Sequence, residues 1–474
     1  MKLAPFAVLS DDEIRHIHQA SLDILETSGV EINHPRMLDF LAGKGLPVDR
    51  DRRIVRFPRA AMEDALATIP PTFDVFDREG RCCYVLGDGE PKFAAGHNAV
   101  FWVDAGTGET RPSRVSDVEH FARICEELEC IDMIGIPVMP QDVPNPRATL
   151  LYGVRATIEN SRKPIFFSTD RHSVNGPIIE MLRAAFKGNL REQAYGISQL
   201  SPTSPLYWEE GVLEAIMDTA GTGVPLAILP EPNAGVSAPY TLAGLLLVNN
   251  VECLSGLAMI QLLHPGAKVM YANSWTATDM RSGATLVGST EMNLCRIAGT
   301  QLGKFYRVPT HTTAPNSDNH AHDEQNAWEK TFSTFTAAGA GTDLLVNCGM
   351  FATGMTCSHE QLIMDEEISA MSRRIAKGMR VDEETLAAGL VKEIGPHGES
   401  YLTADHTLDW LHRGEYLTPR VSVRGSFALW QAAGAKDTYQ LARRRAQAAP
   451  QQPALPLDDA RKAQLAEIVK GFTS

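Results

Sequence analysis

From residue 92 onward, short apolar runs alternate with longer amphipathic stretches along the chain. Apolar runs of about four to eight residues between helical stretches are typical of strands buried on both faces of a parallel sheet. Eight such strand–helix pairs follow one another. The predicted strands lie within residues 93–103, 133–138, 164–168, 194–199, 225–229, 268–273, 305–309 and 343–348. The predicted helices lie within residues 116–128, 148–160, 176–186, 207–220, 240–263, 284–302, 324–338 and 359–376.

Eight consecutive strand–helix units favour an α/β protein of the (β/α)8 TIM barrel type. A doubly wound open sheet is the alternative, but the chain has no Gly-rich phosphate fingerprint of the kind such sheets often carry. We expect an N-terminal α/β cap at residues 1–90, the barrel at 91–380, and a C-terminal helical extension packing on the barrel at 381–474.

The run at residues 343–348 is bounded by Gly341 and Gly349, with a helical stretch on either side. If this run is a barrel strand, Asn347 and Phe351 lie at its carboxyl end. Barrel enzymes place their chemistry at that end of the strands.

Composition narrows the class of protein. At 474 residues the chain is long enough for a barrel and an extension, and its 44% hydrophobic content is ordinary for a globular protein. The net charge of −14 argues against nucleic acid or an anionic membrane as a partner. The eight cysteines lack CxxC spacing and are typical of reduced thiols in a cytoplasmic protein. We expect no signal peptide and no membrane span.

In a barrel, the residues just after each strand form one rim. This rim is polar and partly acidic, with aromatics but few Lys or Arg, which suits a cationic or neutral nitrogen compound better than a phosphate. The rim residues are His97, Asn98, Gln141, Asp142, Thr169, Asp170, Gln199, Glu231, Asn273, Trp275, His311, Asn347 and Phe351.

Each candidate also has a purely structural interpretation. Glu231 would be an exposed turn acid and Trp275 a plug at the top of the barrel. His97, His311 and Asn347 would be structural hydrogen-bonding groups, and Phe351 would pack against a helix.

The run from His320 to Asp323 resembles a metal cluster. However, HExxH, paired CxxC and other zinc spacings are absent, so we expect a solvated loop with Asp323 near the next helix start, and no metal. GxGxxG and GxxxxGK[ST] are also absent, which argues against nucleotide binding.

Several long blocks, taken together, resemble the trimethylamine methyltransferase family, the MttB-like corrinoid-dependent methyltransferases. The similarity runs through nearly the whole barrel and beyond it. The blocks are SPLYWEEGVLEAI (204–216), APYTLAGLLLVNNVECLSGLAMIQLLHPGA (238–267), DMRSGATLVGSTEMNL (279–294), HEQLIMDEEISAMSRRIAKGMRVDEE (359–384) and IGPHGESYLTADHT (394–407).

The resemblance implies a barrel that moves a methyl group from a methylated amine to the Co(I) of cobalamin. That corrinoid is held by a separate partner protein, which docks over the barrel mouth. This chain lacks DxHxxG, the motif with which corrinoid proteins supply a cobalt-ligating His. We therefore expect no cofactor bound tightly by this chain.

Family members that act on trimethylamine contain pyrrolysine near the barrel mouth. This sequence has only standard residues, and residues 311–325 depart from the pattern of such members. Non-pyrrolysine relatives include glycine betaine methyltransferases, so a betaine-like quaternary amine is the expected substrate. Its departing tertiary amine is neutral and needs no proton, which leaves the chain to hold the cation, align it and exclude water.

We assign catalytic roles to Glu231 and His311, with Glu231 holding the cation. The substrate-binding set comprises His97, Asn98, Gln199, Trp275, Asn347 and Phe351, with the aromatic members facing the cation. Three alternatives stay open: methyl transfer from another N-methylated compound, a barrel lyase or hydrolase, and a non-catalytic quaternary-amine-binding module. Assembly into a homo-oligomer also stays open.

Overall fold

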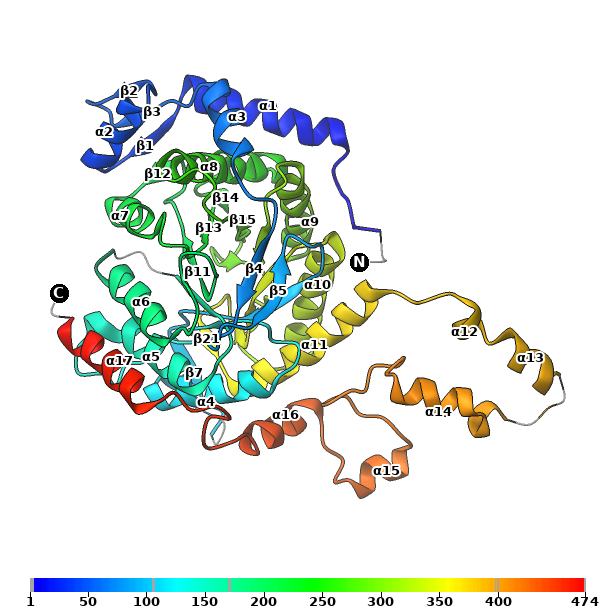
Figure 1. Cartoon of the computed structure of the whole chain (residues 1–474). Coiled ribbons are helices and arrows are strands. Elements are labelled where there is room, and N and C mark those ends of the chain that lie inside the picture. The colour runs from blue at the N-terminus through cyan, green and yellow to red at the C-terminus, as the bar shows by residue number, and fades with distance from the viewer. Residues whose placement is uncertain (1–3, 105–106, 169–171, 397, 399, 473–474) are drawn as a thin grey trace.

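The computed structural model describes residues 4–104, 107–168, 172–396, 398 and 400–472. At its centre eight parallel strands form a barrel, in the order β6-β19-β18-β15-β13-β11-β10-β9, and a parallel bridge between Ala94 and Met133 closes the ring. The predicted α/β barrel is confirmed (Figure 1). The strands are β6 Lys92–Ala95, β9 Ile134–Gly135, β10 Ile165–Ser168, β11 Gly196–Leu200, β13 Leu226–Ile228, β15 Val269–Asn273, β18 Thr310–Thr313 and β19 Leu344–Cys348.

Helices surround the strands (Figure 1). They are α4 Val115–Glu127, α5 Thr149–Asn160, α6 His172–Ala185, α7 Glu210–Thr219, α8 Leu242–Leu263, α9 Thr290–Phe305, α10 Glu324–Ala340 and α11 His359–Lys377. Local sequence sets their ends: Asp323 caps α10 by accepting from two backbone N–H groups, and Gly341 ends it with a left-handed φ of 83°.

Helix α8 is long and apolar enough to cross a membrane by length and composition alone. In the structure, however, 78% of its most apolar window is buried inside the protein. It is covered on its outer side by the N-terminal helices and on its inner side by the barrel, so it needs no polar face.

The predicted strand at residues 305–309 is wrong. Helix α9 continues to Phe305, Arg307 takes a left-handed φ of 56°, and the seventh strand is Thr310–Thr313. The sequence of this strand is THTT, so it has no apolar run to mark it. Its hydroxyl groups are satisfied by hydrogen bonds, as from Thr310 Oγ1 to Asp343 at 2.7 Å. The starts of two predicted helices are strands instead, at Tyr207–Trp208 (β12) and Thr285–Leu286 (β17).

The barrel interior is a packed apolar core. It includes Ala94, Phe166 and Met270 from different strands. A hairpin of β4 (Phe73–Phe76) and β5 (Cys82–Leu86) adds Phe73, Val75 and Leu86 to this cluster. The hairpin therefore closes one end of the barrel and leaves the carboxyl ends of the strands as the open rim.

The N-terminal residues pack on the outside of the barrel through α1 (Asp11–Thr27), α2 (Pro35–Gly43) and α3 (Arg59–Ala67). Strand β1 (Val30–Ile32) pairs in parallel with β12, so this region is joined to the barrel by a shared sheet as well as by side chains.

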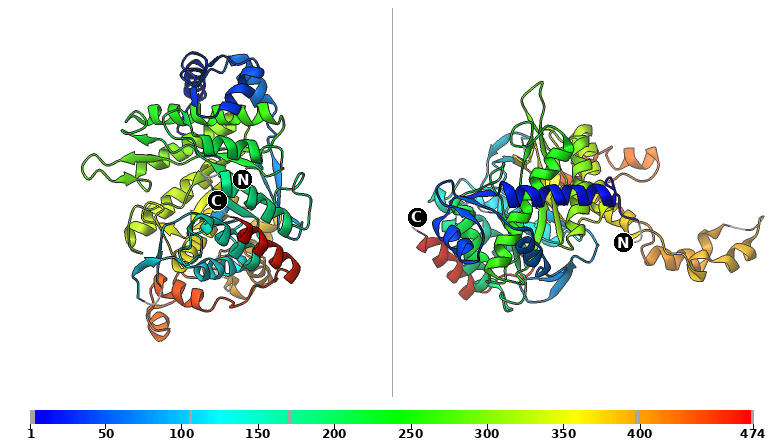
Figure 2. Two further views of the ribbon diagram at one scale, coloured as in Figure 1. Left: turned by 90° about the vertical axis from the view of Figure 1, so that its left-hand side faces the viewer. Right: turned by 90° about the horizontal axis from the view of Figure 1, so that it is seen from above.

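At the other terminus, α16 (Thr438–Gln447) packs on α11, and α17 (Asp459–Gly471) packs on α5 and α6. Between α11 and α16, the chain projects away from the barrel as α12 (Glu383–Leu386), α13 (Ala388–Ile394), α14 (Asp405–His412) and α15 (Phe427–Ala432) (Figures 1 and 2). The division into three domains at residues 90 and 380 stays a prediction. All eight cysteines are free thiols, and five are buried.

Glu252 of α8 gives the fold a measurable pH dependence. Its buried carboxylate accepts from Leu206 N at 2.7 Å and from Ser204 Oγ at 2.8 Å, and burial raises its pKa to about 7. Because the folded pKa lies above the unfolded value, the stabilisation is fully present at low pH and is lost as pH rises through about 7.

We therefore predict that the unfolding free energy of the wild type falls relative to Glu252→Gln by about 3 kcal/mol between about pH 4 and about pH 8. Denaturant titrations at both pH values measure this difference. A difference that does not change with pH would contradict the assignment.

Candidate active site at the carboxyl ends of the strands

Two histidine rings meet inside the barrel at its open end. Strands β10 and β18 lie opposite each other in the ring, yet Phe166 and His311 stack with ring centroids 5.3 Å apart, so both side chains point inward. His97, two residues past β6, lies edge-on to Phe166 at 5.0 Å. The structure thus brings His97 and His311, both predicted from sequence, to the same aromatic ring.

Both imidazoles are neutral near pH 7. Burial lowers the pKa of His97 to about 4 and that of His311 to about 3, and the proximity of the two rings lowers the latter further. Gln199 Nε2 lies 3.3 Å from His97 Nε2. If the amide nitrogen donates in this bond, the His97 proton is on Nδ1.

Several buried polar atoms of this group have no hydrogen-bond partner among the described residues. They are His97 Nδ1, both ring nitrogens of His311, and Gln199 Oε1. Buried polar atoms are rarely left unpaired in folded proteins, so this group is a candidate ligand site.

A second polar chain follows the rim across four strand ends. Asn347 Nδ2 donates to Asn316 Oδ1 at 2.7 Å, and Asn316 Nδ2 donates to the Thr313 carbonyl at 3.1 Å. Thr313 Oγ1 reaches Ser274 Oγ at 3.4 Å, and Ser274 hydrogen-bonds to Glu231. This chain connects the ends of β19, β18, β15 and β13.

Asn347 occupies an irregular backbone position. Its φ is 148°, and the pairing of β19 with β6 shifts register between Val346 and Cys348. A bulge of this kind re-aims a side chain, here toward Asn316. Non-glycine residues with positive φ are uncommon and cluster at functional sites.

Glu231 supplies a carboxylate to this rim. Its side chain is exposed, yet loss of solvation raises its pKa, and the hydrogen bond from Ser274 partly offsets the rise. Glu231 is thus accessible at the carboxyl end of β13, although the atoms packed around its carboxyl reduce its solvation. It is therefore placed to meet a cation entering the mouth.

The predicted aromatic residues lie elsewhere. Trp275 is fully buried in the cluster between the barrel and its outer helices, and a Cβ on Gly299 of α9 would lie 2.7 Å from its ring. Phe351 is buried beside His322, with centroids 4.6 Å apart. Both rings are therefore packed among protein side chains, and Trp275 Nε1 is buried without a hydrogen-bond partner among the described residues.

Other rim candidates have local partners. Asn98 Nδ2 donates to the Ser168 carbonyl at 3.2 Å, and its Oδ1 is buried without a partner among the described residues. Asp142 accepts from the backbone N–H of Val115 at the start of α4, and Gln141 donates to the Val100 carbonyl. Asn273 accepts from Thr312 Oγ1 within the wall. Thr169 and Asp170 lie outside the described residues.

Sequence reasoning missed Phe166, Ser274, Thr313 and Asn316, which connect the predicted residues. Phe166 is hidden in an ordinary apolar strand. The remaining three are short polar residues whose role depends on neighbouring strands, although the polar run THTTAPNS at 310–317 is a signal that a strand end here is unusual.

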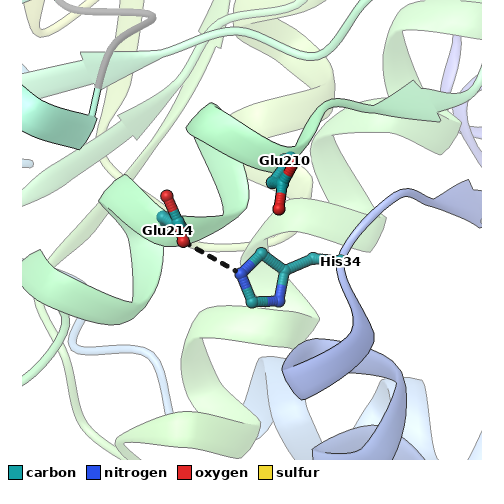
Figure 3. A group of neighbouring side chains, drawn as sticks. All are labelled: His34, Glu210 and Glu214. Atoms are coloured by element: carbon teal, nitrogen blue, oxygen red, sulfur yellow. Dashed lines mark hydrogen bonds and ion pairs between the residues drawn. The ribbon is translucent and has the colours of Figure 1, made fainter.

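Two clusters raise the question of metal. In the 320–323 loop, His322 Nε2 instead bonds to Ser358 Oγ at 3.1 Å, and Asp323 caps α10. Between α2 and α7, ligand atoms of His34, Glu210 and Glu214 lie within 4.8 Å of one another (Figure 3).

In that second cluster, His34 Nδ1 accepts from the Met37 backbone N–H, so the ring proton is on Nε2, the atom that faces Glu214 at 3.4 Å. His34 therefore acts as a helix cap and hydrogen-bond donor that joins α2 to α7.

Enzymes with a (β/α)8 barrel have their active sites at the carboxyl ends of the strands, where this chain has its polar groups. The family model "Trimethylamine methyltransferase (MTTB)" matches residues 1–471. Trimethylamine methyltransferase MttB of Desulfitobacterium hafniense is 30% identical over 438 residues, covering 92% of this chain and 88% of the relative. Glycine betaine methyltransferase of the same species is 29% identical, covering 90% and 89%.

The crystal structure of the Methanosarcina barkeri monomethylamine methyltransferase has the same fold, with a TM-score of 0.52 at 11% identity, covering 98% of this chain and 89% of that one. The chain belongs to the trimethylamine methyltransferase family. It is an enzyme of the transferase class.

The buried imidazoles make the protein sensitive to acid. The folded pKa of His311 lies below its unfolded value, so its stabilising contribution is present above about pH 6.5 and is lost as pH falls toward about 3. We predict that His311 makes the unfolding free energy of the wild type fall by about 2 kcal/mol between about pH 7 and about pH 5. The variant His311→Phe, which keeps the ring stack, should lack this part of the fall.

Urea unfolding at the two pH values measures this change, with His412→Gln as the matched control because that histidine is exposed. An equal loss of stability in wild type and His311→Phe would show that the ring does not stay neutral.

Proposed function

We propose that this chain moves a methyl group from a betaine-like quaternary ammonium to the Co(I) corrinoid of a partner protein. The observation that carries the proposal is Glu231, an accessible carboxylate at the end of a rim network whose other members are uncharged. A fixed positive charge is the ligand that such a carboxylate selects. A cytoplasmic location is part of the proposal.

Family membership narrows the substrate to a methylated amine, and the sequence favours a quaternary one. It contains only standard residues, whereas the family resemblance assigns pyrrolysine to members that act on trimethylamine. One relative is named glycine betaine methyltransferase, and its match covers 90% of this chain.

The chemistry needs little acid–base assistance from the protein. When the methyl group leaves a quaternary ammonium, the bond electrons stay on nitrogen and a neutral tertiary amine departs, so no proton has to be supplied. Neutral His97 and His311 are consistent with this requirement, because neither has to be a general acid. What the chain contributes is binding, alignment and exclusion of water.

A betaine also carries a carboxylate, and the His97–His311 group offers donors for it. Each neutral imidazole carries one N–H, and neither His97 Nδ1 nor the His311 nitrogens have partners among the described residues. With Glu231 at the ammonium and the imidazoles at the carboxylate, the two substrate charges would be fixed at different strand ends. The methyl groups would then face out of the mouth.

The corrinoid supplies the nucleophile in this reaction, as Co(I). This chain lacks the DxHxxG motif, which supports a separate protein as the carrier. In the proposal the carrier docks over the open carboxyl ends of the strands, since the β4–β5 hairpin packs against the opposite end of the barrel.

The lyase or hydrolase alternative has less support. A pKa near 3 makes His311 a weak base at neutral pH, and the described side chains of Glu231 and His311 share no hydrogen bond. A non-catalytic amine-binding module is distinguished by the assay below, because it would bind an amine without transferring its methyl group.

Methylation of cob(I)alamin by the purified protein, followed optically, tests the proposal. The substrate panel is glycine betaine, carnitine, choline and trimethylamine. We expect turnover with a betaine and none with trimethylamine. Turnover with trimethylamine alone would overturn the proposed substrate class, and calorimetric binding without turnover would indicate a binding module.

Glu231→Gln tests the role of the carboxylate. We predict a fall in kcat/KM of about 10- to 100-fold, corresponding to about 1–3 kcal/mol of lost charge attraction at an accessible site. Because the pKa of Glu231 is raised and only its ionised form attracts a cation, wild-type kcat/KM should also rise with pH through that pKa. Glu63→Gln, at an exposed position in α3, is the control for loss of one charge. Equal kcat/KM in both variants would exclude the assigned role.

A further inference from the structure

The chain has an extension without a core of its own. We define the arm as residues 378–419, which contain α12, α13 and α14. None of its described residues is buried. Segments that fold normally bury apolar side chains to offset the loss of conformational entropy. The arm does not do so within a single chain.

Large apolar side chains are instead presented to solvent along the arm. Ten of them are between 39% and 85% exposed. They are Met379, Val381, Leu386, Val391, Tyr401, Leu402, Leu408, Leu411, Tyr416 and Leu417. Exposed apolar side chains gathered in this number on one extension are a candidate interaction surface.

Polar contacts hold the arm together. Arg380 pairs with Glu384 at 3.0 Å, and Arg413 pairs with the same carboxylate. The guanidinium of Arg413 also lies 5.0 Å from the centre of the Trp410 ring. These contacts join α12 to α14, so the arm is preorganised, which lowers the entropic cost of docking.

The arm is anchored at its base so that it points outward. Arg374 of α11 donates to the Glu415 carbonyl at 2.9 Å, and just beyond the arm Arg420 donates to Glu366 at 2.9 Å. Figure 1 and the right-hand view of Figure 2 show α12–α14 extending away from the barrel. The arm therefore does not cover its own barrel.

We propose that the arm holds this chain to a second copy of itself. At these exposures each large apolar side chain offers roughly 100 Å², so ten offer on the order of 1,000 Å². A stable interface needs about 800 Å² from each partner, and in a two-fold pair each copy contributes an arm.

The position of the arm favours a second copy over a partner that must reach the active site. Helix α11 begins beside the mouth, after β19, and ends at Lys377 near the amino ends of the strands. The arm starts there, away from the rim that carries Glu231, so it leaves the mouth free.

Each copy also has an apolar groove of about 440 Å³ between α1, α8 and α9, lined by Leu9, Ile17, Leu246 and Leu294 among others. A pair of copies brings both apolar surfaces, whereas a different partner would have to bring its own.

Leu402→Glu combined with Leu411→Glu tests the proposal. Both side chains are about 70–80% exposed, at 79% and 69%, so the barrel should fold unchanged. By light scattering at micromolar concentration, we expect the wild type to have at least twice the 51.8 kDa of one chain, and the variant to fall to one chain mass. Lys392→Glu with Thr418→Glu, at exposed polar positions of the arm, is the matched control and should keep the wild-type mass.

Amide hydrogen exchange provides a second readout that does not depend on mass. Residues of α12 and α14 should be protected in the wild type and exchange at least tenfold faster in the variant, whereas barrel strands should be unaffected. If the double glutamate variant is insoluble, Leu402→Ser with Leu411→Ser serves in its place. A wild type of single-chain mass, or a variant that keeps both mass and protection, would overturn the proposal.

Discussion

The buried ion pair between Lys330 of α10 and Asp365 of α11 fixes the geometry on which the rim depends. Its atoms lie 2.8 Å apart, and both side chains are fully buried. Asp365 also accepts from the backbone N–H of Gly349 at 2.7 Å, and Lys330 reaches the Pro315 carbonyl at 3.4 Å. One pair therefore fixes the segments that follow β18 and β19. Removing one partner of such a pair typically costs about 3–5 kcal/mol, because the other charge stays buried.

Those two segments carry Asn316 and Asn347, the amides of the rim network. Their positions are set by a charge pair behind them. The network of amides at the rim therefore contains no charge of its own. The other polar group of the mouth is also uncharged: it consists of two neutral imidazoles that pack against Phe166. A strong ion pair thus lies behind the mouth, and apart from Glu231 the named groups that line it are uncharged, which suits a substrate that carries its own charges.

The parts added to the barrel differ in how they are held. The N-terminal region shares a sheet with β12, and α16 and α17 pack on barrel helices. The arm is different, since it is anchored only at its base and exposes its apolar side chains. The contrast indicates that the extension has two functions, one part completing the barrel wall and the other available for association.

The sequence by itself determined the class of fold, because eight apolar strands buried on both faces produce a periodic signal that survives without tertiary information. It also placed Asn347 correctly at a strand end, and family resemblance in long blocks identified the family. The strand at Thr310–Thr313 was missed because its polar residues are satisfied by partners distant in sequence, such as Asp343.

Only the tertiary structure decided which strand-end residues share a site. Residues at one strand end alternate between the mouth and the wall, and this direction depends on register and bulges rather than on residue type. Trp275 and Glu231 are both suitable for a cation by chemistry, yet Trp275 packs against α9 while Glu231 is accessible. The pKa values of the histidines are likewise properties of burial, which no local sequence pattern encodes.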